Sequence, residues 1–313
     1  FYSPSNFPVK SILKIYDEDN IIYAFSGGDK LSYYDQGIWE FENLNGFDSI
    51  SSVTKNDLNT FYGSFSNGIL DYNNFIFIDD KYHSSLLKKN SNSSDIVVTD
   101  IEYLQDMLWI LNYGSNTPLV SRDMNNNWQS YDIGVGFNYP LSLTFNGSET
   151  IWVIHDKNKL GGITLFNTSS KEKFNLTITE NKLNSTNVNT IAIDQNDYVW
   201  IGSDEGLIYF TTSKFEGVKN YDNYLIPNNG ERNIFQNIKI NDILVDYSNK
   251  KWIATDQGIF VFNSESKTIE SIKSDNSPLQ SNNVLSIDMD KKGDLFILTD
   301  YGLILYKTYN ELP

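Results

Sequence analysis

The sequence lacks cysteine entirely and contains only two histidines among its 313 residues. Without cysteine there are no disulfide bonds and no thiolate ligands for a metal, although this absence does not identify the cellular compartment. No run of 18 apolar residues occurs, so no segment is expected to span a membrane as a helix. The first residues also lack the charged and apolar regions of a signal peptide, which indicates a mature chain or an excised segment.

Positive charge is scarce as well. The chain has 24 Lys and Arg residues against 40 Asp and Glu residues, so its formal net charge is −16 and its pI is about 4.5. A phosphate backbone would be repelled overall, and no basic stripe along the chain opposes that repulsion. We therefore expect no nucleic-acid partner, and any anionic ligand would need a local group of Lys and Arg residues.

Aromatic residues, in contrast, are abundant. The chain has 20 Tyr, 19 Phe and 6 Trp residues, and apolar residues make up 40% of the sequence. This is enough material for a large core and excludes a disordered chain. The excess of Tyr and Phe over Met favours strands over helices.

Three segments of the sequence, 191–210, 243–262 and 287–306, repeat one pattern without gaps. In each, an Asp precedes an aromatic residue by six positions, a Ser or Thr follows the aromatic residue at the third position, and a Gly follows it at the sixth. The Asp and aromatic pairs are Asp194 with Trp200, Asp246 with Trp252, and Asp290 with Phe296. Internal repeats of this kind determine the fold more directly than any single motif.

The same frame finds four weaker copies upstream. The seven aromatic anchors are Tyr23, Tyr62, Trp109, Trp152, Trp200, Trp252 and Phe296, and successive anchors are 39 (Tyr23 to Tyr62) to 52 (Trp200 to Trp252) residues apart. A period of roughly 40 to 50 residues is typical of a four-stranded propeller blade. We therefore predict an all-β fold, with residues 1–313 forming a single seven-bladed β-propeller of four-stranded antiparallel blades.

Each part of the repeat has a predicted structural task. The Asp caps the turn after the first strand, the aromatic residue fills the space between blades, and the Gly takes a positive φ in a tight turn. The Ser or Thr satisfies backbone groups at the end of the second strand, or it belongs to a polar ring near a ligand. The last copy ends near Tyr306, so residues 1–6 are predicted to supply its fourth strand, with a frayed end as the alternative.

Catalytic and metal-binding patterns are weak. His83 lies in the polar segment 79–89, and neither it nor His155 has a metal-ligand spacing such as His-Glu-x-x-His. Residues 17–20 and 288–294 are rich in Asp, as Ca²⁺ loops are, but neither has the full series of oxygen ligands. We expect no catalytic residue, no metal and no cofactor. A propeller hydrolase or lyase would need a His or carboxylate cluster in its channel, for which the sequence offers only His155.

Three loops are longer than their counterparts in the other copies. They are residues 112–118, 155–162 and 215–237, and in a propeller they are expected to lie on the same face. Binding residues concentrate in such loops, although drift in loops without function is the alternative. The residues predicted to bind a ligand or partner are Tyr113, His155, Lys157, Lys159, Tyr221, Tyr224, Arg232 and Phe235.

The pattern Asp-x5-Trp-Ile-x-Thr-x2-Gly at residues 246–258 resembles the two-component regulator propeller repeat of Bacteroidetes proteins. Residues 243–262 and 276–306 are similar to the closing blades of the second propeller in PorZ-type components of the type IX secretion system. Residues 2–28 are similar to the beginning of that propeller. Members of the PorZ family carry a further propeller and a C-terminal sorting domain, so the resemblance implies either an excised domain or a different member of the wider repeat family.

The resemblance implies a non-enzymatic protein of the periplasm or cell surface, associated with the outer membrane. The implied partners are a sortase-type attachment complex and anionic lipopolysaccharide or another anionic glycan, with Lys157, Lys159 and Arg232 supplying charge-assisted contacts. The alternative is the periplasmic sensor propeller of a hybrid two-component regulator, binding an oligosaccharide at a similar face. The repeat itself specifies the fold more than the function.

Overall fold

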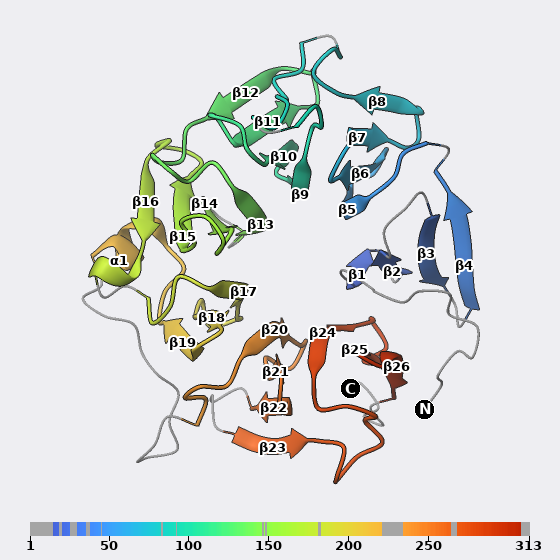
Figure 1. Ribbon diagram of the computed structural model, residues 1–313, viewed down its shortest axis with the longest axis vertical. Coiled ribbons are helices and arrows are strands. Elements are labelled where there is room, and N and C mark those ends of the chain that lie inside the picture. The colour runs from blue at the N-terminus through green and yellow to red at the C-terminus, as the bar shows by residue number, and fades with distance from the viewer. Residues whose placement is uncertain are drawn as a thin grey trace. The chain divides into compact units, whose positions relative to one another are not determined.

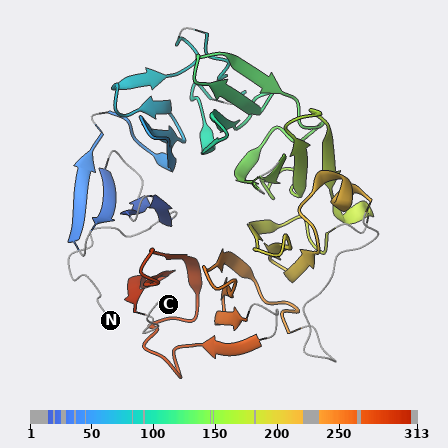
Figure 2. The ribbon, with the colours of Figure 1, turned by 180° about the vertical axis from the view of Figure 1, so that it is seen from behind.

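The computed structural model describes residues 15–18, 21–25, 30–35, 38–44, 46–82, 84–91, 93–145, 147, 149–180, 183–220, 234–263 and 268–307. These residues form 26 strands, one α-helix and one 3-10 helix (Figure 1). The strands pair into seven sheets, and neighbours within each sheet are joined in chain order (Figure 2). The predicted all-β, antiparallel class is confirmed.

The chain divides into two compact units. The N-terminal unit contains Ile12–Leu143 and Asn158–Leu160, and the C-terminal unit contains most of the rest, Thr144–Lys157 and Gly161–Pro313. The prediction that residues 1–313 form a single domain is not tested by this division and stays a prediction.

Three four-stranded sheets lie in the N-terminal unit. The first is formed by β1 (Ile15–Glu18), β2 (Ile21–Phe25), β3 (Lys30–Asp35) and β4 (Ile38–Asn43). The second is formed by β5 (Ile50–Lys55), β6 (Thr60–Ser64), β7 (Gly68–Asp71) and β8 (Ile76–Ile78). The third is formed by β9 (Val98–Leu104), β10 (Met107–Asn112), β11 (Leu119–Asp123) and β12 (Trp128–Tyr131).

The other four sheets follow along the chain, and the boundary between the units falls inside β13. The fourth sheet is formed by β13 (Pro140–Phe145), β14 (Thr150–His155), β15 (Ile163–Asn167) and β16 (Lys173–Leu176). The fifth is formed by β17 (Val188–Ile193), β18 (Val199–Ser203) and β19 (Gly206–Phe210). The sixth is formed by β20 (Ile240–Val245), β21 (Lys251–Thr255), β22 (Gly258–Phe262) and β23 (Thr268–Ile272), and the seventh by β24 (Val284–Met289), β25 (Leu295–Thr299) and β26 (Gly302–Tyr306).

Each predicted aromatic anchor lies in the second strand of its sheet and is buried. The anchors and their strands are Tyr23 in β2, Tyr62 in β6, Trp109 in β10, Trp152 in β14, Trp200 in β18, Trp252 in β21 and Phe296 in β25. Trp200 packs into a core with Ile240, Ile253 and Phe262 of the sixth sheet. In the C-terminal unit, therefore, this anchor fills the space between two sheets, as predicted.

In the second sheet the position equivalent to the other aromatic anchors is one residue earlier than predicted. Ser64 pairs with the first residue of β5, just as Ser203 pairs with the first residue of β17. Counting back three positions from each, Phe61 rather than Tyr62 corresponds to Trp200. The turn that follows Ser64 is one residue longer than the turn that follows Ser203, and this extra residue shifted the sequence alignment.

One short helix was not predicted. α1 (Phe215–Lys219) follows the fifth sheet, at the beginning of the long segment 215–237. Its buried Phe215 and Val218 join a core that includes Trp152 and Leu165. An inserted segment thus begins with a turn of helix packed on the sheets (Figure 1).

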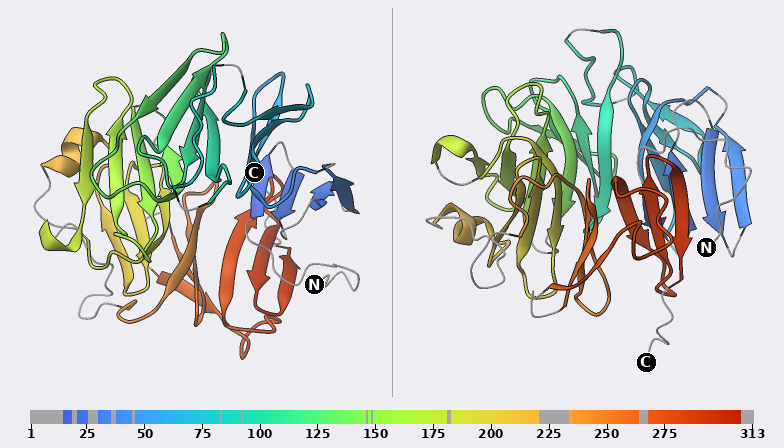
Figure 3. Two further views of the ribbon diagram at one scale, coloured as in Figure 1. Left: turned by 45° about the horizontal axis from the view of Figure 1, so that its top comes forward. Right: turned by 60° about the horizontal axis from the view of Figure 1, so that its bottom comes forward.

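The two ends of the strands define two faces of each unit, and the strands are seen from the side in Figure 3. Within each unit we call the side at which the second strand of a sheet ends the exit face, and the side at which it begins the entry face. The predicted fourth strand of the last sheet, residues 1–6, lies outside the described residues.

Candidate functional site

The repeated Asp forms the turn at the entry face of the C-terminal unit. Its Oδ1 accepts hydrogen bonds from two backbone N–H groups, two and four residues later, at Asp194, Asp246 and Asp290. Its Oδ2 accepts from the indole Nε1 of Trp200 or Trp252, at 3.0 Å in both cases. The six-residue spacing therefore lets the Asp accept a hydrogen bond from the Trp of its own repeat. The predicted role of the Asp in capping the turn is confirmed.

The repeated hydroxyl closes the turn at the exit face. Ser203, Thr255 and Thr299 each donate a hydrogen bond to the carbonyl oxygen of the Gly three residues later, at 3.0, 2.7 and 3.1 Å. Each hydroxyl oxygen also accepts from the backbone N–H two residues later. At these three positions the hydroxyl satisfies backbone groups, as predicted.

His155 occupies the corresponding position at the end of β14, and it is 1% exposed. Its Nε2 lies 2.8 Å from the hydroxyl of Thr164, and that hydroxyl donates its proton to Asn175 at 2.8 Å. Nε2 is therefore the protonated ring nitrogen. Burial lowers the pKa of His155 from 6.5 to about 3, so the imidazole is neutral at physiological pH.

Lys157, in the long turn after β14, is part of an ion pair. Its Nζ lies 3.0 Å from Oδ2 of Asp204, whose other oxygen accepts from Asn189 at 2.9 Å. Burial raises the pKa of Asp204, but the hydrogen bonds from Asn189 and Lys157 outweigh it, and the pKa lies below its usual value. The charge of Lys157 is thus already balanced by a carboxylate of the C-terminal unit.

Lys159 lies instead beside tyrosines of the N-terminal unit. Its Nζ is 4.9 Å from the centre of the Tyr139 ring, a distance at which a cation is attracted to the ring face. Tyr139 in turn contacts Tyr113 edge-on, with ring centres 5.1 Å apart. Lys159 is exposed and both tyrosines are half-buried.

Two exposed apolar residues lie beside Lys159. Leu160 follows it in the chain and is 47% exposed, and its Cδ2 lies 3.3 Å from where a Cβ would stand on Gly136, the neighbour of Val135, which is 97% exposed. We call Tyr113, Val135, Tyr139, Lys159 and Leu160 the tyrosine–lysine patch. Sequence reasoning missed Tyr139, because it follows an ordinary connection between sheets and only its contact with Lys159 distinguishes it.

The remaining predicted residues fall in the segment 215–237. Phe235 is fully buried in the core between the fifth and sixth sheets, where its ring lies 5.6 Å from that of Phe262. Tyr221, Tyr224 and Arg232 lie outside the described residues. Of the eight predicted binding residues, the structure therefore groups Tyr113 with Lys159, pairs Lys157 with Asp204, and buries His155 and Phe235.

The long turns and the connections that lead to first strands share the exit face within each unit. In the C-terminal unit the backbone N–H of Gly162, at the end of the long turn 155–162, donates to the carbonyl of Thr186, which precedes β17. In the N-terminal unit the N–H of Gly114 donates to the carbonyl of Asn138, which precedes β13. The expected shared face is confirmed inside each unit, and the convergence of all three long loops stays a prediction.

Two further features are absent from the described residues. No three His, Asp or Glu side chains of its described residues lie close enough together to hold a metal ion. Over the same residues, no helix is both long and apolar enough to cross a membrane. His83 lies outside the described residues, so its predicted place in a polar loop stays a prediction.

Comparison with known proteins places these features in a family context. Residues 182–205 match the family model described as two component regulator propeller. The matched segment contains Asp194, Trp200 and the hydroxyl of Ser203, which are the parts of the repeat whose hydrogen bonds are described above. No protein with curated annotation matches the chain.

Solved structures match nearly the whole chain. PorZ of Porphyromonas gingivalis, an essential bacterial surface component of the type-IX secretion system, matches with a TM-score of 0.80 and 20% identity, over 96% of this chain and 46% of PorZ. The extracellular domain of a putative hybrid two component system from B. thetaiotaomicron matches with a TM-score of 0.69 and 19% identity, over 98% of this chain and 39% of that one. The chain has the β-propeller fold.

Streptogramin B lyase is also similar, with a TM-score of 0.68 and 14% identity over 96% of this chain and 95% of the lyase. At these identities the likeness concerns the fold alone. The predicted resemblance to the propeller repeat and to PorZ is confirmed, and this propeller spans about half the length of the PorZ structure.

Proposed function

We propose that the chain is a non-enzymatic binding module of the bacterial cell envelope, with a role like that of PorZ in type IX secretion and cell-surface attachment. In this proposal its sheets close into a seven-bladed ring, and it acts in the periplasm or at the cell surface, associated with the outer membrane. The description of PorZ as a bacterial surface component and the match over 96% of this chain support the proposal.

The observation that carries the binding role is the tyrosine–lysine patch. Tyrosine rings offer flat surfaces for the carbon face of a sugar, and an exposed Lys offers a charge-assisted contact to an anionic group. On a chain of net charge −16, an exposed cation held over a tyrosine ring is a local site of the kind that an anionic ligand needs. We propose that this patch contacts an anionic glycan such as that of lipopolysaccharide. A protein partner of the sortase-type attachment complex is proposed on the resemblance to PorZ.

The test uses binding to vesicles that contain purified lipopolysaccharide, with phosphatidylcholine vesicles as the neutral reference. Replacing the exposed cation in Lys159→Gln removes the charged contact and is expected to weaken binding about ten-fold. Lys157→Gln is the matched control, because Lys157 lies two residues away and is paired with Asp204. We expect it to change binding less than two-fold. If both variants and the unmodified protein bound the lipopolysaccharide vesicles equally, the proposed role of the tyrosine–lysine patch would be contradicted.

The second candidate is the ligand-sensing propeller of a hybrid two-component regulator. The extracellular domain of a putative hybrid two component system matches 98% of this chain, and the matching family model is described as two component regulator propeller. In that case the tyrosine–lysine patch would bind a neutral or acidic oligosaccharide. A screen of soluble oligosaccharides distinguishes the two, because a sensor requires a tight soluble ligand and the envelope module does not.

The structural relatives include enzymes, among them streptogramin B lyase and virginiamycin B lyase, so an enzymatic role is the remaining alternative. The buried, neutral His155 supports the non-enzymatic proposal, because a general acid or base must reach the substrate. Its Nε2 is engaged with Thr164 inside the core.

A further inference from the structure

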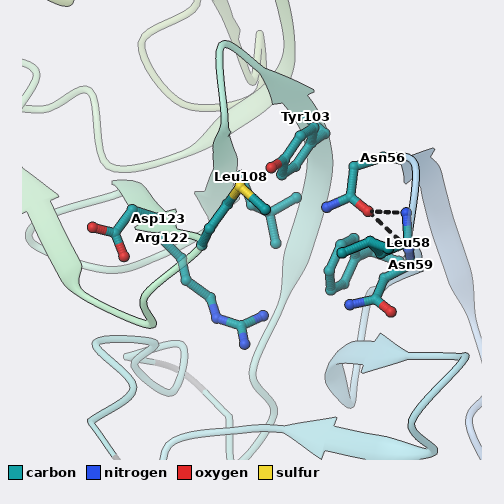
Figure 4. Close-up of a pocket in the computed structure, with 9 residues that line it drawn as sticks. Asn56, Leu58, Asn59, Tyr103, Leu108, Arg122 and Asp123 are labelled. Atoms are coloured by element: carbon teal, nitrogen blue, oxygen red, sulfur yellow. Dashed lines mark hydrogen bonds between the residues drawn. The ribbon is translucent and has the colours of Figure 1, made fainter.

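A pocket opens at the entry face of the N-terminal unit, at the opposite strand ends from the tyrosine–lysine patch. Its volume is about 110 Å³, and it lies between the second and third sheets (Figure 4). The lining residues are Asn56, Leu58, Asn59, Phe61, Tyr103, Leu108, Arg122, Asp123 and Met124. No feature of the sequence distinguished this pocket, because its walls come from segments up to 68 residues apart (Asn56 to Met124).

Arg122 is held rigidly in this pocket. Its Nε donates to the side-chain oxygen of Asn126 at 2.8 Å. Its guanidinium carbon lies 5.9 Å from the centre of the Phe61 ring and 5.8 Å from that of the Trp128 ring. These contacts orient the guanidinium and leave its two terminal NH₂ groups available as a fork of donors.

The charge of Arg122 has no carboxylate partner within ion-pair distance among the described residues. The neighbouring Asp123 accepts from the side chain and backbone of Asn127 and from the backbone of Asn125. These bonds, the side-chain bond of Asn127 first, lower the pKa of Asp123 and occupy its oxygens, and the charge of Arg122 adds the smallest contribution from a distance. Figure 4 shows its carboxylate directed away from the guanidinium.

Other donors in the pocket face the same space. Oδ1 of Asn56 accepts from the backbone N–H groups of Leu58 and Asn59, at 2.9 and 2.7 Å. This arrangement fixes the amide so that its NH₂ group turns toward the pocket (Figure 4). The hydroxyl of Tyr103 points into the same space. The polar wall therefore consists mainly of donors, which suits a ligand rich in acceptors.

The rest of the lining is apolar. Leu58 and Met124 are 68% and 61% exposed at the rim, and Phe61 and Leu108 are buried in the wall. One water-sized atom takes up roughly 10 to 15 Å³ of cavity volume. The pocket volume of about 110 Å³ therefore has room for about 7 to 11 non-hydrogen atoms. A planar, bidentate guanidinium beside apolar walls matches a carboxylate joined to a compact apolar body.

We propose that this pocket is a second binding site, separate from the proposed glycan contact, in which Arg122 holds the carboxylate of a small, partly apolar ligand. Asn56 and Tyr103 supply further hydrogen bonds to the carboxylate, and Phe61 and Leu108 contact the body of the ligand. The site goes beyond the proposed function, because it lies on the other face and requires neither the patch nor an envelope partner.

The probe is benzoate, whose nine non-hydrogen atoms match the estimated room. Binding to the full chain is measured by saturation-transfer NMR and isothermal titration, with benzamide as the neutral analogue and inorganic phosphate as the tetrahedral anion. We expect benzoate to bind at millimolar concentration or below and at least ten-fold more tightly than either analogue. Equal binding of benzamide would overturn the role of the charge, and equal binding of phosphate would overturn the carboxylate assignment.

Variants locate the binding. Arg122→Gln is expected to weaken benzoate binding at least ten-fold, and Arg122→Lys about five-fold, because Lys keeps the charge but loses the fork. Tyr103→Phe removes one hydroxyl without disturbing Arg122, so it tests the site if an Arg122 variant unfolds, and we expect a two- to five-fold loss. Lys159→Gln, which removes one positive charge on the other face, should leave benzoate binding unchanged. Unchanged binding in both Arg122→Gln and Tyr103→Phe would overturn the proposal.

Discussion

At the scale of single residues, Lys251 departs most clearly from its repeat. The equivalent positions before the aromatic anchor are apolar in the fifth and seventh sheets, where Val199 and Leu295 are found. Lys251 is 0% exposed, and its Nζ lies 2.8 Å from Oδ2 of Asp194 and 3.1 Å from the carbonyl of Asn249. The repeated Asp of one sheet thus receives a cation from the next sheet in the same unit.

Removing this cation is expected to destabilise the C-terminal unit. Lys251→Met leaves the carboxylate of Asp194 buried without its charge partner, which costs about 3 to 5 kcal/mol. The midpoint of urea unfolding measures the loss. The double variant Lys251→Met with Asp194→Asn is the control, because it removes both charges and should recover part of the stability. A single variant as stable as the unmodified protein would contradict the role of the pair.

His155 makes a prediction about pH. Its folded pKa of about 3 lies below the value of 6.5 expected in the unfolded chain, so unfolding takes up a proton between these pH values. The stability from the neutral imidazole is therefore complete above pH 6.5 and is lost as the pH falls toward 3. At about 1.4 kcal/mol per pH unit, roughly 2 kcal/mol is lost by pH 5.

The measurement compares unfolding of the unmodified protein and of His155→Gln at several pH values. Carboxylates contribute equally to both proteins, so the difference in slope between pH 6.5 and 5 isolates His155. Parallel pH profiles would show that burial does not suppress protonation of this imidazole.

At the scale of elements, the turn between the second and third strands depends on its Gly. Gly206 has φ +120°, and a Cβ added there would lie 2.4 Å from the carbonyl oxygen of Phe235. Gly302 has a similar φ of +129°, but no atom of the described residues lies within 4 Å of an added Cβ. Among the described residues, the Gly position of the repeat therefore has an unfavourable φ in both sheets and a close contact only at Gly206.

Alanine at these two positions separates the effects. Gly302→Ala is expected to cost about 1 to 3 kcal/mol, from the unfavourable φ alone. Gly206→Ala should cost at least 1 kcal/mol more, because backbone atoms of Phe235 must move. Thermal unfolding of the two variants provides the comparison, and equal losses would mean that the close approach is relieved without cost.

The length of one turn also explains why the sequence pattern selects Tyr62 and not Phe61 as the anchor of the second sheet. The repeat pattern counts six positions from the aromatic residue to the Gly, so the additional residue in the turn after Ser64 makes the pattern select Tyr62, whereas strand pairing makes Phe61 the equivalent of Trp200. Two adjacent aromatic residues in β6 made both alignments acceptable on the sequence alone. Strand pairing decides between them, since neighbouring residues of a strand face opposite sides.

At the scale of the whole molecule, net charge and local charge have different consequences. The net charge of −16 excludes a polyanionic partner held by the overall field, and it leaves individual cations to act through their surroundings. Lys157, Lys159 and Arg122 show three such surroundings: an ion pair, a tyrosine ring and a donor-lined pocket. Only the last two leave a cation available to a ligand.

The sequence by itself determined the strands and their turns, because the Asp bonds to the Trp six residues later and the hydroxyl to the Gly three residues later. It also determined which turns are long. Tertiary structure decided what those long turns offer, since it buried His155 and Phe235, paired Lys157 and placed Lys159 over Tyr139. It alone revealed the Arg122 pocket, because contacts between neighbouring sheets join residues that no local pattern connects.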